Sequence, residues 1–169
     1  MRVVYVSVIP SGIWSEYKNM DAWDAAYKRA TEAGILVLDC TYERGITLTC
    51  SYDLHDPDNP KKCIPSWGLG PINPPRMRIN IPTSRTTATE GESYGFSYQF
   101  TGIGGLSWTV PYLAGVLAMG WQVNPHLTGE QLLDLIYASA YEVNYKTEGT
   151  VMIINPRGFI DLVKDTTSQ

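Results

Sequence analysis

Charged residues are scarce in this chain: they make up 18% of its 169 residues and leave a net charge of −4. The lysines and arginines are scattered, and no three of them are consecutive. A nucleic-acid-binding surface needs clustered positive charge, so this composition argues against a nucleic acid partner. Histidine is scarcer still, with two residues, which restricts the choice of a general base at neutral pH.

Long apolar runs are absent too, because no stretch approaches the roughly 20 residues that a membrane-spanning helix needs. The first residues lead directly into a Val-rich, strand-like run, so we expect neither a secretory signal peptide nor a membrane partner. Three cysteines are an odd number and do not suit a disulfide scaffold. Cys50 and Cys63 flank a loop and can pair in an oxidising compartment, whereas Cys40 lies in an apolar run and is expected to be a buried thiol. The compartment itself is left open.

What the sequence does contain, 44% hydrophobic residues with 15 glycines and 11 prolines, is typical of one compact domain with many turns. The pattern predicts a strand over Arg2–Ile9, a helix over Asp21–Ala33 that ends at Gly34, and a strand over Ile35–Cys40. Strand, helix and strand in this order predict a right-handed βαβ unit in a parallel sheet.

The rest of the chain alternates between irregular and regular segments. A long loop without regular secondary structure is predicted over Asp53–Pro75, because this segment is rich in Pro, Asp, Asn and Gly. A helix over Ser107–Gln122 is apolar on all sides and is expected to be central and buried. The remaining predicted elements are strands at Met77–Ile81, Ser93–Phe100 and Val151–Ile154, a helix from the capping box of Thr128 and Gln131 through Tyr141, and a helix over Phe159–Lys164.

The most informative segment is 105–115, which places Ser107 two residues after Gly105, at the start of the apolar helix. A serine there has an accessible hydroxyl, and its backbone N–H lies at the positive end of the helix dipole. Two interpretations are open. Ser107 is either a helix N-cap, since serine is a favoured capping residue, or a nucleophile.

The same segment resembles the nucleophile motif of the subtilisin-like serine peptidases, Gly-Thr-Ser-Met-Ala-x-Pro-x-x-Ala-Gly. The matching residues are Gly105, Ser107, Pro111, Ala114 and Gly115, while the two residues that flank Ser107 differ. The resemblance implies that Ser107 is the catalytic nucleophile and that Gly105 and Ser107 form the turn and part of the oxyanion hole. It implies no cofactor and no metal.

Other segments are similar to the same family and occur in its order. Val3–Val8 resembles the strand that binds extended substrate, Asn124–Thr128 the turn into a later helix, and Ile154–Asp161 the closing segment. The resemblance therefore implies an α/β fold, a parallel sheet with helices on both faces. It also implies that residues 1–169 are a single domain-sized unit, the C-terminal half of a subtilisin-like catalytic domain.

A complete catalytic triad is not expected within this chain, because the family's Asp and His precede all of these segments. His126 lies in a Pro-flanked turn and His55 in the Asp- and Pro-rich loop, and neither follows a strand and opens a helix. Without a base, a serine hydroxyl is a poor nucleophile.

The implied substrate cleft also departs from the family pattern. Its walls are Ser7, Val8, Ile9, Thr41 and Tyr42. Glu43 stands where the family has the oxyanion-hole Asn, and Ile9 stands where a Gly lets substrate approach. An anion at position 43 opposes the developing charge, and losing one such donor raises the barrier by roughly 3–4 kcal/mol. The site is therefore expected to be degenerate.

Weaker alternatives concern other ligands. The glycines of Gly102–Gly105 precede a helix and suit a phosphate, but no complete phosphate-binding motif follows. Calcium would use oxygen ligands, and zinc would use thiols and an imidazole, but neither set has the spacing of a known site. The candidate calcium ligands are Asp53, Asp56, Asp58 and Asn59, and the candidate zinc ligands are Cys50, His55 and Cys63.

Four aromatic residues fall on one face of a predicted strand: Tyr94, Phe96, Tyr98 and Phe100. They either pack in the core or form a surface that binds a missing N-terminal half.

Three functions remain. The chain is an inactive or weak peptidase-related scaffold that binds a peptide or a partner chain. Alternatively, it is the nucleophile-bearing part of an active endopeptidase whose Asp and His come from an upstream segment or another chain. The third function is a plain interaction module. A half-domain exposes surface that its other half covers, so association with that half, a partner chain or itself is expected.

Overall fold

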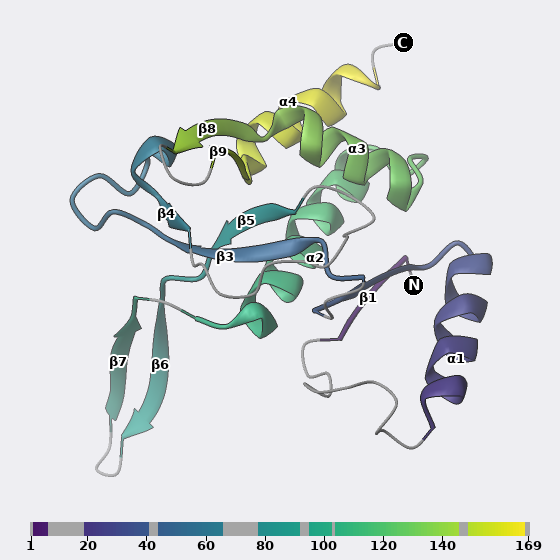
Figure 1. Cartoon of the computed structure of the whole chain (residues 1–169), viewed down its shortest axis with the longest axis horizontal. Coiled ribbons are helices and arrows are strands. Elements are labelled where there is room, and N and C mark those ends of the chain that lie inside the picture. The colour runs from purple at the N-terminus through teal and green to yellow at the C-terminus, as the bar shows by residue number, and fades with distance from the viewer. Residues whose placement is uncertain are drawn as a thin grey trace.

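The computed structural model describes residues 2–6, 19–40, 44–65, 78–91, 95–102, 104–145 and 149–167. Within these ranges the chain is a mixed α/β protein with four α-helices and strands in three groups (Figure 1). The α/β composition predicted from the sequence is confirmed. No helix of the described part is long and apolar enough to cross a membrane.

The N-terminal unit is the predicted βαβ unit. Strand β1 (Val3–Val6) and strand β2 (Leu36–Asp39) are parallel, with Val3 opposite Leu36, and helix α1 (Met20–Glu32) joins them. Gly34 follows the helix with φ +74°, a left-handed conformation that glycine adopts without a steric penalty. The predicted bounds are therefore correct to within three residues over the described part.

A mixed sheet of five strands follows in the order β4-β3-β5-β9-β8. Its strands are β3 (Thr47–Ser51), β4 (Ile64–Pro65), β5 (Ile79–Pro82), β8 (Tyr141–Tyr145) and β9 (Gly149–Ile153). The pairs β3–β5 and β5–β9 are parallel, whereas β4 and β8 are antiparallel to their neighbours. The prediction of a parallel sheet is thus right for the interior of this sheet and wrong at both edges.

Strand β8 replaces the end of a predicted helix. Helix α3 (Gly129–Ser139) stops before Tyr141, where the sequence analysis continued it. The reason is visible in the alternation at the start of β8: Val143 is buried between exposed Glu142 and Asn144. A period of two with aromatic and β-branched residues favours a strand over a helix.

A two-stranded hairpin, β6 (Arg85–Gly91) with β7 (Gly95–Thr101), projects from the body of the molecule (Figure 1). β7 agrees with the predicted strand, and β6 was not predicted. Tyr98 and Phe100 are 74% and 49% exposed, so the core-packing interpretation is wrong for these two, and the side chain of Phe96 lies outside what the structure describes. Tyr94 lies outside the described residues.

Helix α2 (Leu106–Val123) organises the core by packing across β1, β2, β3 and β5. Two later helices, α3 and α4 (Pro156–Asp165), also pack against α2. The buried face of α2 includes Val110, Leu113 and Leu117. Its opposite face is exposed, so the prediction of a helix buried on all sides is only half right.

Candidate functional site

Ser107 lies inside the first turn of α2. The helix begins at Leu106, its N-cap is Gly105 in an extended conformation, and the Trp108 N–H donates to the Gly105 carbonyl at 3.0 Å. Ser107 therefore occupies the second helical position, and its interpretation as the N-cap is wrong. The backbone N–H groups of a first helical turn have no intrahelical acceptor, so this position favours a developing negative charge.

The Ser107 side chain is half-buried and points back over the start of the helix. A Cβ at Gly105 would stand 3.8 Å from the Ser107 Oγ, which is ordinary contact. Among the described residues, none hydrogen-bonds to this hydroxyl. The hydroxyl is therefore sterically available, but within the described ranges no residue is hydrogen-bonded to it to activate it.

The polypeptide before the helix is held at the carboxyl end of β5. The Gly104 N–H donates to the Thr83 Oγ1 at 2.8 Å, and the Ser84 Oγ donates to the Gly102 carbonyl at 2.6 Å. The Thr83 N–H in turn donates to the Cys50 carbonyl on β3 at 3.0 Å. Ser107 thus sits beyond the carboxyl ends of two parallel strands, the edge where α/β folds usually place functional groups.

A buried hydrogen bond attaches the first turn of α2 to strand β3. The Thr109 side chain is fully buried, its hydroxyl donates to the Leu106 carbonyl at 2.8 Å, and it lies 2.6 Å from the Thr47 Oγ1 on β3. The position of Ser107 is therefore set by the sheet rather than by a mobile loop.

Neither histidine is placed to act on Ser107. His126 follows the far end of α2, whose 18 residues at 1.5 Å per residue span about 27 Å. His55 is exposed on the loop after β3, where its N–H donates to the Asp53 Oδ1 at 2.8 Å. Among the described residues the structure brings together Gly105 and Ser107 but no base.

The other predicted site residues lie outside the described ranges. They are Ser7, Val8, Ile9, Thr41, Tyr42 and Glu43. Asp39, the last residue of β2, and Cys40 are the described residues that directly precede Thr41. Asp39 is 2% exposed, and the Cys40 thiol, half-buried rather than buried, donates to the Val6 carbonyl at 3.8 Å. Burial, and then the negative charge of Asp39, raises the pKa of Cys40.

A cavity of about 240 Å³ lies between β2, α1 and α3. Its polar lining is Tyr27, Asp39, Arg44 and Glu130. The Arg44 guanidinium pairs with Asp24 at 2.6 Å and lies 4.3 Å from the centre of the Tyr27 ring. No sequence motif indicated this cluster, because its members come from four separate segments. We interpret it as a structural cluster held by the Arg44–Asp24 ion pair and the contact of Arg44 with the Tyr27 ring.

The metal alternatives find no support in the described chain, where no group of three His, Cys, Asp or Glu side chains could hold a metal ion. Asp56 pairs with Lys62 at 3.0 Å and accepts from the Asn59 amide at 3.1 Å. The candidate calcium ligands therefore form a solvated turn with partners of their own. The candidate zinc ligands separate into an exposed His55 and two buried thiols.

Comparison with known proteins adds no relative: no protein-family model matches the chain, and no curated protein matches it.

Proposed function

We propose that this chain is a subtilisin-like half-domain, with helices on both faces of a mixed sheet, that acts as a peptide- or partner-binding scaffold with little peptidase activity of its own. The observation that carries the proposal is the place of Ser107. It lies in the first turn of a helix at the carboxyl ends of β3 and β5, without a histidine in reach among the described residues. The βαβ unit precedes the serine helix, which is the order that the resemblance implies and supports the proposal.

The missing base accounts for the low activity that we propose. A serine hydroxyl becomes a nucleophile when a histidine takes its proton, and removing that histidine from a serine triad lowers kcat by roughly a millionfold. The chain retains the helix-terminal amides that could bind an oxyanion. Binding of a substrate-like peptide without turnover is therefore the function that these features support.

A second candidate is an active endopeptidase whose Asp and His come from an upstream segment or a partner chain. The accessible Ser107 hydroxyl, which no described residue engages, favours it. An exposed apolar stripe on α2 also favours it, because such a stripe suits a covering partner. The stripe consists of Trp108, Tyr112 and Met119, which are 43%, 37% and 43% exposed.

Fluorophosphonate labelling separates the two candidates, because the reagent forms an adduct only with an activated serine. The protein is treated in an extract of the cells that make it, where any upstream segment or partner chain is present, beside a serine peptidase of known activity, and Ser107→Ala serves as the negative variant. Ser84→Ala is the matched control, since the Ser84 hydroxyl is engaged with the Gly102 carbonyl. We expect no adduct at Ser107. An adduct that S107A abolishes and S84A preserves would overturn the scaffold proposal and establish an active nucleophile.

A further inference from the structure

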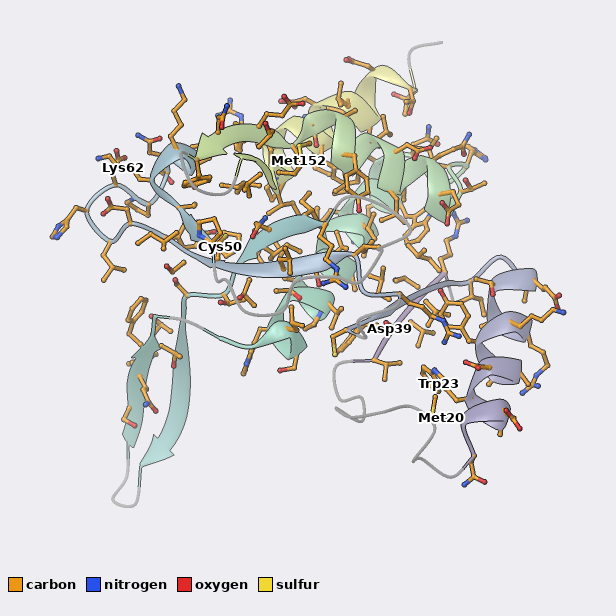
Figure 2. All side chains as sticks on the ribbon, viewed as in Figure 1. Met20, Trp23, Asp39, Cys50, Lys62 and Met152 are labelled. Carbon is orange, nitrogen blue, oxygen red and sulfur yellow. The ribbon has the colours of Figure 1, made fainter. Side chains whose placement is uncertain are left out.

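Two of the three cysteines lie side by side in a small second core. Cys50 on β3 is 0% exposed and Cys63, which precedes β4, is 3% exposed. They pack with Val143, Val151 and Ile153 of β8 and β9, and the rings of Tyr52 and Tyr145 cover them. Figure 2 shows Cys50 on β3 and Lys62, the neighbour of Cys63, on the turn that leads into β4.

The strand register explains why the two thiols meet. Cys50 pairs with Pro65 in the β3–β4 ladder, and Cys63 directly precedes β4, two residues before Pro65, which makes it a diagonal neighbour of Cys50. The Cys50 thiol hydrogen-bonds to the Cys63 sulfur. The Tyr145 hydroxyl donates to the Cys63 carbonyl and holds this residue against β8. Cys40 is elsewhere, with its thiol directed at β1.

We propose that Cys50 and Cys63 are a redox pair, which closes to an intramolecular disulfide by exchange with a small disulfide of the glutathione class, while Cys40 remains a thiol. The proposal is independent of whether Ser107 is active.

The exchange balances in two steps. The Cys63 thiolate attacks one sulfur of oxidised glutathione, forms a mixed disulfide and releases one glutathione thiolate. The Cys50 sulfur then gives up its proton to solvent, attacks the Cys63 sulfur and releases the second glutathione. The protein loses two electrons and two protons, and one oxidised glutathione becomes two reduced ones.

Cys63 is the first nucleophile for two reasons. It is the more exposed of the two residues and follows a short 3-10 turn, Pro60–Lys62, that can open locally. The hydrogen bond from Cys50 stabilises the Cys63 thiolate and lowers the pKa of Cys63, while the same bond, with burial, raises the pKa of Cys50. The thiolate is the form that attacks a disulfide.

The test compares the linked pairs formed in native and in unfolded protein. The folded full chain is equilibrated with oxidised and reduced glutathione, free thiols are blocked, and linked peptides are identified by mass spectrometry. We expect the Cys50–Cys63 peptide as the only linked pair. In urea the preferred pair should instead be Cys40–Cys50, because these two residues are ten positions apart in the sequence. Cys50 and Cys63 are thirteen positions apart. Loop closure then favours the 40–50 pair by about 1.5-fold.

Variants keep the result interpretable. Cys40→Ser should still form the native link, and its oxidation should raise the Tm by about 5–10 °C, since the link closes a short loop. Adding Cys63→Ser to Cys40→Ser should abolish both the link and the shift. The proposal is overturned if native protein forms the 40–50 link, carries only glutathione adducts, or stays fully reduced under conditions that oxidise the unfolded chain.

Discussion

Gly120 is a position of close approach between α2 and Phe159 of α4, and replacing it by Ala should destabilise the fold. A Cβ at this position would lie 2.5 Å from the Phe159 Cζ and 3.0 Å from the Leu132 Cδ2. Real Cβ atoms do not approach so closely, so Phe159, which is fully buried, has to move. The matched position is Gly115 in the same helix, where a Cβ would meet nothing within 4 Å.

Two opposing effects set the magnitude. Ala is favoured over Gly in a helix interior by about 1 kcal/mol, and this gain applies to both positions. Overpacking a filled core costs about 1–3 kcal/mol and applies only at Gly120. We therefore expect Gly115→Ala to stabilise the protein by up to about 1 kcal/mol and Gly120→Ala to destabilise it by up to about 2 kcal/mol.

Thermal unfolding followed by circular dichroism measures the difference. For a chain of this size 1 kcal/mol corresponds to about 2–4 °C in Tm, so the two variants, which differ by the overpacking cost, should differ by about 2–12 °C. Equal Tm values for Gly115→Ala and Gly120→Ala would refute the reasoning, because they would mean that α4 does not pack on α2 as described. The double variant Gly120→Ala with Phe159→Leu should recover part of the loss by giving the new methyl group room.

Two further predictions concern single contacts. Thr109→Val should lower the free energy of unfolding by about 1–3 kcal/mol, because it leaves the buried Thr47 hydroxyl without its partner. In urea unfolding, the double variant Thr47→Val, Thr109→Val should lose less stability than the sum of the losses of the two single variants. At Asp56, the hydrogen bond from Lys62 lowers the carboxyl pKa below its ordinary value, followed by that from Asn59. A depressed carboxyl pKa gives a contribution that is present above the unfolded pKa and is lost as the pH falls through the folded pKa. NMR titration should therefore show a higher Asp56 pKa in Lys62→Met than in the native chain, and an unchanged value would contradict the pair.

Local patterns predicted the elements whose signals are contained in one segment. The βαβ unit, the start of α2 and the capping box of Thr128 with Gln131 all belong to this class, and both halves of the capping box are present. β3, β4, β6 and β8 were missed because strands are stabilised by pairing with their neighbours, which a single segment does not reveal. The exposed side of α2 was missed for a related reason: its apolar residues alone do not show which of them a sheet will cover.

The candidate site divides in the same way. The Gly-x-Ser spacing was sufficient to place Ser107 at a helix start, because capping preferences and glycine turns are local. The contact between Cys50 and Cys63 depends on the β3–β4 register, so the sequence could offer it only as one option. The stacking of Arg44 on Tyr27 joins a helix to a distant loop and left no sequence signal.

The hairpin β6–β7 and the helix that carries Ser107 share one clamp. Ser84 and Thr83 bind the chain at Gly102 and Gly104, directly between the base of the hairpin and the start of α2. Seven residue pairs lie beyond this clamp, from Arg85–Thr101 outward to Gly91–Gly95. Changes of length at the outer end are thereby insulated from the serine, so the hairpin is the part of this fold where lineages can diverge, or a designer can graft a recognition loop, without rebuilding the helix entrance.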